Sequence, residues 1–283
     1  RGFPSTLKSV DMAMTSVAMT KADMAAAAFA DTLSGNIPEI NAVLAAYGIT
    51  GVALREWQLD GGRVLPTGGV WVSGEVDTGI FASGDGTQAS PYLIRTAEQL
   101  RAFAGSLNNK INYADKYVAL DADIDVSDAA WAPIGGSDWA FAGTFDGRGH
   151  TISGLTVGSA SAPLALDGDN LFMGLFGVLE KTAVVRDVAL RNVAFYTSYE
   201  ATAYVGGIAG YLNGSGESNV FTGAVVDGCS VSGVISHTSA KGNQFVGGIV
   251  GMQYKGAVIN SASFADLSCT VLSSDLAEVG GLG

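Results

Sequence analysis

Apolar residues recur at helical spacing in the first 50 residues of the chain. From Thr6 to Leu33 they follow steps of three and four, the period of one face of an α-helix, and this stretch contains no Gly or Pro. Asn36 is a suitable cap for a second helix that begins at Ile37 and stops at Gly48. The pattern predicts a helical hairpin over residues 1–50.

The period of the pattern changes in residues 51–80. Apolar positions such as Val52 and Leu54, and later Val70 and Val72, alternate with other residues and lie among Gly and Pro. Alternation of this kind, bounded by turn-forming residues, is typical of short strands. We therefore expect a β connector over residues 51–80.

Two short elements recur in the same order in the rest of the chain. The first has the form Gly-x-x-Gly and stands at 174–177, 207–210 and 248–251, with an incomplete copy at 281–283. The second starts with Ala and two apolar residues and stands at 183–187, 224–228 and 257–261. Such self-similarity indicates a repeat architecture.

Each repeat contains apolar stretches of only a few residues, separated by Gly, Ser, Asn and Asp. A unit of this kind cannot bury its apolar face alone, whereas stacked units pair their strands and enclose a continuous core. A β-propeller would need four longer strands in each blade. We therefore predict a mainly β protein, with a right-handed parallel β-helix over residues 81–283 that follows the N-terminal helical segment.

One helix is expected inside the β region. Thr96, with Gln99 three residues later, forms a capping-box pattern, and Leu100, Phe103 and Leu107 behind it lie on one helical face. A helix at this place would cover the first strands of a stacked structure and protect their edges and core.

Three stretches carry a resemblance to a known family. The run from Phe141 to Ile152 resembles the F-x-G-T-F-D-G-x-G-H-T-I signature of β-helical bacterial surface proteins, and the Gly-x-x-Gly segments are similar to the GLUG motif. The stretch from Gly84 to Gly135 resembles the entry segment of the same domains. GLUG repeats occur in adhesin-like proteins and in non-catalytic parts of immunoglobulin A peptidases, so the resemblance implies a cell-surface or secreted protein.

Composition and charge narrow the range of partners. The chain has 48% hydrophobic and 15% charged residues, too apolar for disorder, and no apolar run reaches the roughly 20 residues of a membrane-spanning helix. Its formal net charge of −12 disfavours nucleic acid and anionic membranes. We expect an extracellular or cell-surface protein without membrane insertion, and, because the last residues break off inside a repeat, a part of a longer chain.

Three acidic residues form a candidate cation site. Asp121, Asp123 and Asp125 alternate along the chain, so an extended strand would project all three carboxylates from one face. Carboxylate oxygens are ligands for calcium, although the spacing of a calcium loop is absent and a solvated outer face explains the same pattern. We therefore assign no metal, cofactor or catalytic residue.

The remaining reactive residues do not form a catalytic set. His150 and His237 are the only histidines, and Cys229 and Cys269 occupy different places in their repeats, where stacking would not join them. Arg186, Asp227 and Asn260 fall at equivalent places of the second element and are expected to form a polar column. Only one of these three is acidic, whereas glycoside cleavage needs two carboxyl groups.

The leading hypothesis is an adhesin-like β-helix that binds host proteins or glycans, or that acts as a rigid spacer. The alternative is a carbohydrate-active enzyme, because polysaccharide lyases and hydrolases commonly have a parallel β-helix fold. A non-catalytic segment of a large secreted peptidase is the third.

Overall fold

The computed structural model describes Gly35, Ile37, Ala42 and residues 57–60, 63–66, 76–165, 170–215, 222–272 and 277–280. The chain divides into two compact units, Arg1–Val72 and Ser73–Gly283. The helical hairpin expected over residues 1–50 lies almost entirely outside the described residues. In the first unit, strands β1 (Trp57–Asp60) and β2 (Arg63–Pro66) pair in antiparallel register.

The second unit consists mainly of four sheets in which every neighbouring pair of strands is parallel. The first sheet contains β3 (Tyr92–Ile94), β4 (Tyr117–Leu120), β6 (Thr144–Asp146), β12 (Val184–Arg186), β18 (Val225–Asp227) and β22 (Ala257–Ile259). The second contains β5 (Ile124–Asp125), β7 (Thr151–Ser153), β13 (Ala189–Ser198), β19 (Ser230–Ser239) and β23 (Ala262–Val271), with β8 (Thr156–Val157) and β9 (Leu164–Ala165) beside β13. The third contains β10 (Asn170–Met173), β14 (Thr202–Val205), β20 (Gln244–Gly247) and β24 (Ala277–Gly280), and the fourth contains β11 (Phe176–Leu179), β15 (Ala209–Leu212) and β21 (Val250–Gln253).

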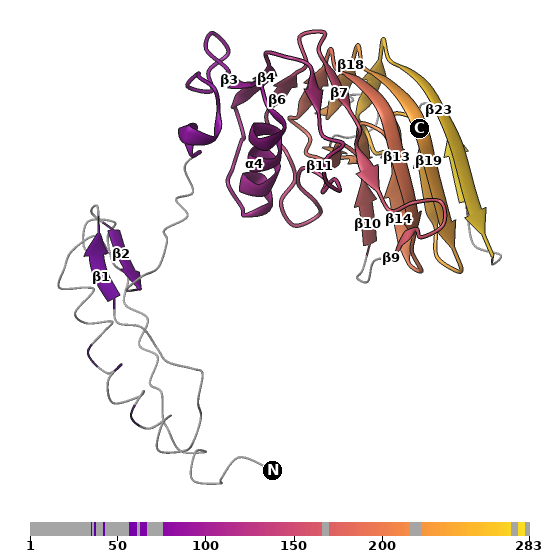
Figure 1. Ribbon diagram of the computed structural model, residues 1–283, viewed down its shortest axis with the longest axis horizontal. Helices are drawn as coiled ribbons and strands as arrows, with labels where there is room; N and C mark the ends of the chain where they lie inside the picture. Colours follow the sequence, from indigo (N-terminus) through magenta and orange to yellow (C-terminus); the bar gives the residue numbers. More distant parts are fainter. Residues whose placement is uncertain are drawn as a thin grey trace. The chain divides into compact units, whose positions relative to one another are not determined.

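The chain visits these sheets in a fixed cyclic order. Strands β12, β13, β14 and β15 belong to the first, second, third and fourth sheets, and β18, β19, β20 and β21 repeat the circuit. Successive circuits therefore lie next to one another in every sheet, as the neighbouring strands β7, β13, β19 and β23 show in Figure 1. The prediction of a mainly β protein with parallel strands is confirmed. A short antiparallel pair, β16 (Gly214–Ser215) and β17 (Thr222–Gly223), interrupts one circuit.

The Gly-x-x-Gly element forms the corner between the third and fourth sheets. Its second residue is apolar and has no exposed surface: Leu175, Ile208 and Ile249 all point into the core. A methyl group on Gly251 would lie 2.6 Å from the backbone nitrogen of Val205, because the two sheets approach closely at this corner. Glycine is therefore required by backbone contact.

Aromatic rings on the third sheet also reflect this close approach. Phe172, Tyr204 and Phe245, on β10, β14 and β20, stack with ring centroids 5.0 and 5.2 Å apart. Tyr211 of the fourth sheet packs edge-on against Tyr204, with centroids 5.3 Å apart. Ring contacts of this geometry add stability beyond the area that they bury.

The register of the second element corrects one prediction. Val225 pairs with Ala257, so Asp227 faces Ile259 and not Asn260. Asn260 has a φ of 50° and follows Ile259 at the level of Gly228, whose φ is 64°. The left-handed corner sets the register here, and Asn and Gly are the residues that accept it. Asn260 nevertheless contacts the predicted column, because its Nδ2 donates to Asp227 Oδ1 at 2.8 Å.

The expected helix is present as α4 (Ala97–Asn108), and its cap matches the prediction closely. Thr96 Oγ1 accepts from the backbone N–H of Gln99 at 3.2 Å, and Gln99 Oε1 accepts from the N–H of Arg95, one residue before the cap. The helix lies beside the first strands of the unit (Figure 1). Its buried side chains are Leu100, Phe103, Ala104 and Leu107.

A buried polar network closes the turn between β19 and β20. His237, which is 1% exposed, lies with Nε2 2.7 Å from Gln244 Oε1 and Nδ1 2.8 Å from Thr197 Oγ1. Gln244 Nε2 donates to the carbonyl of Ala201 at 2.9 Å, which turns its Oε1 towards the imidazole. His237 therefore donates through Nε2 and accepts through Nδ1. Burial lowers the pKa of His237 and favours this neutral form, and the hydrogen bond that His237 donates to Gln244 opposes the shift only partly.

Candidate functional site

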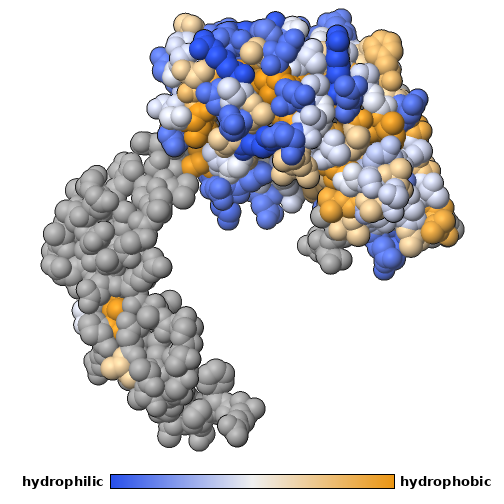
Figure 2. All heavy atoms as spheres, viewed as in Figure 1, coloured by the Kyte–Doolittle hydropathy of each residue, from blue (hydrophilic) through white to orange (hydrophobic). Residues whose placement is uncertain are grey.

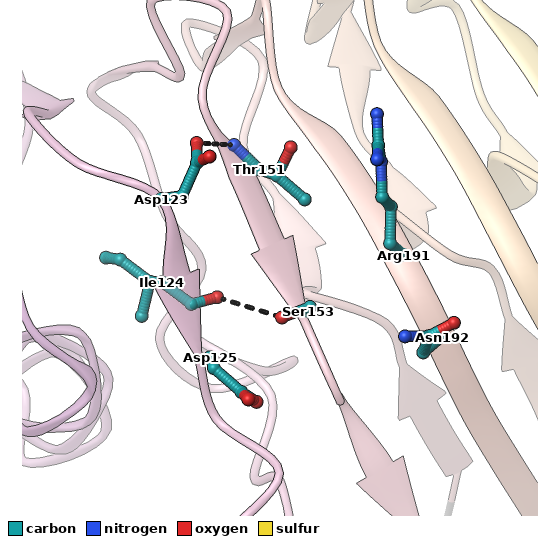
Figure 3. A pocket seen from close by; sticks show the side chains of 7 residues that line it. All are labelled: Asp123, Ile124, Asp125, Thr151, Ser153, Arg191 and Asn192. Carbon is teal, nitrogen blue, oxygen red and sulfur yellow. Dashed lines mark hydrogen bonds between the residues drawn. The ribbon is translucent and has the colours of Figure 1, made fainter.

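An open groove crosses three strands of the second sheet. Its volume is about 300 Å³, and β5, β7 and β13 supply its walls (Figure 3). The residues that line it are Asp123, Ile124, Asp125, Thr151, Ser153, Arg191 and Asn192. All but one of them are polar or charged, so the groove suits a ligand that forms many hydrogen bonds.

A backbone irregularity in β13 gives the groove two of its side chains. The register between β13 and β19 shifts between Leu190 and Val193, and Asn192 has a φ of 54°. Leu190 and Val193 are buried, whereas Arg191 and Asn192 between them are both exposed. An ordinary strand would send one of two consecutive residues inward, so the bulge places an additional polar group on the outer surface.

Both groove carboxylates are held in the ionised form. Asp123 Oδ1 accepts from the backbone N–H of Thr151 at 2.9 Å and lies 3.2 Å from His150 Nδ1. These contacts, the Thr151 bond foremost, lower the pKa of Asp123. Asp125 Oδ1 accepts from the N–H of Ser127 at 2.9 Å, and this bond is the largest cause of the lowered pKa of Asp125.

The three aspartates considered for calcium do not converge. Asp121 is not part of the groove and forms ion pairs with Arg95 at 2.7 Å and with Arg148 at 3.7 Å. Asp123 and Asp125 bind different backbone amides. Across residues 76–165, 170–215, 222–272 and 277–280, no three His, Cys, Asp or Glu side chains form a group that could hold a metal ion.

The other candidate residues serve the fold. Arg186 donates from Nη2 to Asp146 Oδ2 at 2.7 Å, so the arginine of the polar column is ion-paired. Burial raises the pKa of the Cys229 thiol to about 12, and it also raises the pKa of Cys269. Both thiols are free, as their different places in the repeats predicted.

Most of the groove could not be found from the sequence. The alternation of acidic residues pointed to Asp123 and Asp125. No sequence motif marks the other polar residues of the groove, which are Thr151, Ser153, Arg191 and Asn192. They meet the aspartates only because β5, β7 and β13 are neighbours in one sheet. The available signal for the bulge was the pair of consecutive polar residues that ends in Asn and lies between two buried apolar positions. Asn tolerates the left-handed conformation that the bulge needs.

Comparison with known proteins gives relatives but no family. No family model matches the chain. It is 31% identical over 138 residues to the "Putative Gly-rich membrane protein" of Evansella cellulosilytica. This alignment covers 48% of this chain and 15% of that protein. It is also 31% identical over 195 residues to halomucin of Haloquadratum walsbyi, covering 65% of this chain and 2% of that protein. The chain thus spans a small part of each of these relatives.

A solved structure is weakly similar to part of the chain. The crystal structure of a "putative immunoglobulin A1 protease" from Bacteroides ovatus shares 22% identity, covers 72% of this chain and 78% of that chain, and gives a TM-score of 0.37.

None of the helices in the described part of the chain combines the length and the hydropathy needed to cross a bilayer.

Proposed function

We propose that residues 81–283 form a right-handed parallel β-helix with GLUG-type repeats and act as the ligand-binding part of an extracellular or cell-surface protein. The observation that carries the proposal is the cyclic order of strands, which places successive repeats in parallel register in all four sheets. A stack of this kind presents long, rigid outer faces. The relatives named as a Gly-rich membrane protein and as halomucin support a position at the cell surface.

The outer surface supports binding of hydrophilic partners. Hydrophilic residues cover much of the visible surface of the second unit, and apolar residues reach it in separate patches (Figure 2). Such a surface has the character of one that contacts glycans or polar protein surfaces through hydrogen bonds.

The groove favours binding over hydrolysis. An acid that protonates a glycosidic oxygen needs a raised pKa, so that it carries a proton near neutral pH. The pKa values of Asp123 and Asp125 are both lowered. Both carboxylates therefore accept hydrogen bonds at neutral pH and have no proton to give.

A combined binding and product screen tests this function. The purified chain is applied to an array of glycans and extracellular-matrix proteins, and the bound sugars are analysed for cleavage. We expect specific retention with sugars of unchanged length. Shortened sugars would show an enzyme, and an array on which nothing is retained would remove the binding function and leave a spacer.

A further inference from the structure

We propose that the groove between β5, β7 and β13 binds neutral oligosaccharides through their hydroxyl groups. The inference rests on the proposed binding function and assigns it a site and a ligand class. The groove has the donors and acceptors for such a ligand on three neighbouring strands, and Figure 3 shows the side chains that line it.

Arg191 supplies unused donors. Its side chain is exposed, and its guanidinium forms no hydrogen bond or ion pair with the described residues of the chain. Two other arginines of the unit already have partners within the chain. Arg186 binds Asp146, and Arg101 binds Asp128 and the carbonyl of Val126. An exposed guanidinium in a groove can therefore donate to a ligand at little cost.

Asp123 supplies an acceptor that is fixed in place. Both of its contacts, from Thr151 N and His150 Nδ1, end on Oδ1, which leaves Oδ2 available. Because these contacts hold the carboxylate still, a ligand that binds to Oδ2 does not have to order it. Asn192 adds an exposed amide with both a donor and an acceptor.

The charge balance of the groove disfavours an acidic ligand. Two ionised carboxylates face one guanidinium in the groove, and the whole chain has a formal net charge of −12. A carboxylated or sulfated sugar would be repelled. A metal ion is also disfavoured, because the guanidinium lies on the same lining as the carboxylates.

The shape of the groove favours a chain of sugars. It is open to solvent and crosses strands from three successive circuits, so a ligand lying in it can extend along the stacking direction from β5 past β13 towards β19. Sugar hydroxyls both donate and accept, and they match an alternation of Arg, Asn, Ser, Thr and Asp side chains. A neutral, linear oligosaccharide meets all of these conditions.

Isothermal titration of the whole chain with chosen sugars tests the inference. Cellohexaose and mannohexaose are the neutral probes, and hexagalacturonate is the acidic probe. We expect at least one neutral probe to bind at about millimolar concentration or below, and the acidic probe to bind more weakly. Arg191→Ala should weaken binding about ten-fold, since hydrogen bonds to a charged group are lost.

Two further variants make the result specific. Asn192→Gly keeps the left-handed backbone and removes only the amide, so it should weaken binding several-fold without a change in the circular dichroism spectrum. Lys181→Ala removes an exposed positive charge that does not line the groove and should leave binding unchanged. Tighter binding of hexagalacturonate, or no binding of either neutral probe, would overturn the ligand class. Neutral-sugar binding that Arg191→Ala leaves intact would overturn the site while the binding function stands.

Discussion

Gly251→Ala is expected to destabilise the second unit by about 3 kcal/mol, at the upper end of the cost of overpacking a core. The added methyl group would lie 2.6 Å from Val205 N and 2.7 Å from Gly210 O. Both are backbone atoms of neighbouring strands, so no side-chain rotation relieves the contact. Gly210→Ala should have a similar effect, with Tyr204 O at 2.7 Å. Urea unfolding followed by circular dichroism measures the loss.

Gly136→Ala is the matched control for this prediction. No atom lies within 4 Å of the position that its methyl group would take, so the free energy of unfolding should change by no more than about 0.5 kcal/mol. If Gly251→Ala were as mild as this control, the third and fourth sheets would not meet at the Gly-x-x-Gly corner as described.

Phe103→Ala is expected to cost about 3–5 kcal/mol, the usual range for removing a buried aromatic ring. Phe103 has no exposed surface. Its ring contacts those of Phe81, Tyr113, Phe141 and Phe145, with centroids 4.9 to 6.2 Å away. Because these partners come from the segments around the first strands, the ring fixes α4 over the start of the sheets. The midpoint of thermal unfolding reports the effect.

Gly105→Ala in the same helix should act in the opposite direction. Nothing lies within 4 Å of the added methyl group, and alanine is favoured over glycine in a helix by about 0.5–1 kcal/mol. A raised midpoint for Gly105→Ala and a lowered one for Phe103→Ala together describe a helix that is formed and docked. A Phe103→Ala variant with an unchanged midpoint would show that α4 does not cover the core.

Local signals in the sequence predicted much of the fold. Thr96 and Gln99 predicted the start of α4, because capping depends on neighbours in the chain. The Gly-x-x-Gly elements predicted which segments become neighbours. The third residue of one element, Ala209, pairs with the third residue of the next, Val250, in the fourth sheet. Repeats report stacking directly, since equivalent residues occupy equivalent positions.

Features that depend on the exact register were beyond the sequence. Ala224 and Ala257 look equivalent, yet Val225 pairs with Ala257, because the left-handed residues Gly228 and Asn260 must coincide at the corner. The groove depends on the bulge after Leu190 and on contacts between three separate segments. A one-residue difference in loop length changes which residues of neighbouring strands face one another, and no local sequence pattern predicts that difference.

A disulfide trap between successive repeats tests the stacking most directly. Ser236 and Ser268 are paired in the second sheet, and their Oγ atoms lie 2.8 Å apart. In a Cys269→Ser background, Ser236→Cys combined with Ser268→Cys should form a disulfide under mild oxidation, which peptide mapping by mass spectrometry detects. Ser236→Cys combined with Asp266→Cys, two residues out of register, should remain reduced. A registered pair that stays reduced, or a mismatched pair that forms a disulfide as readily, would contradict the parallel stacking of the repeats.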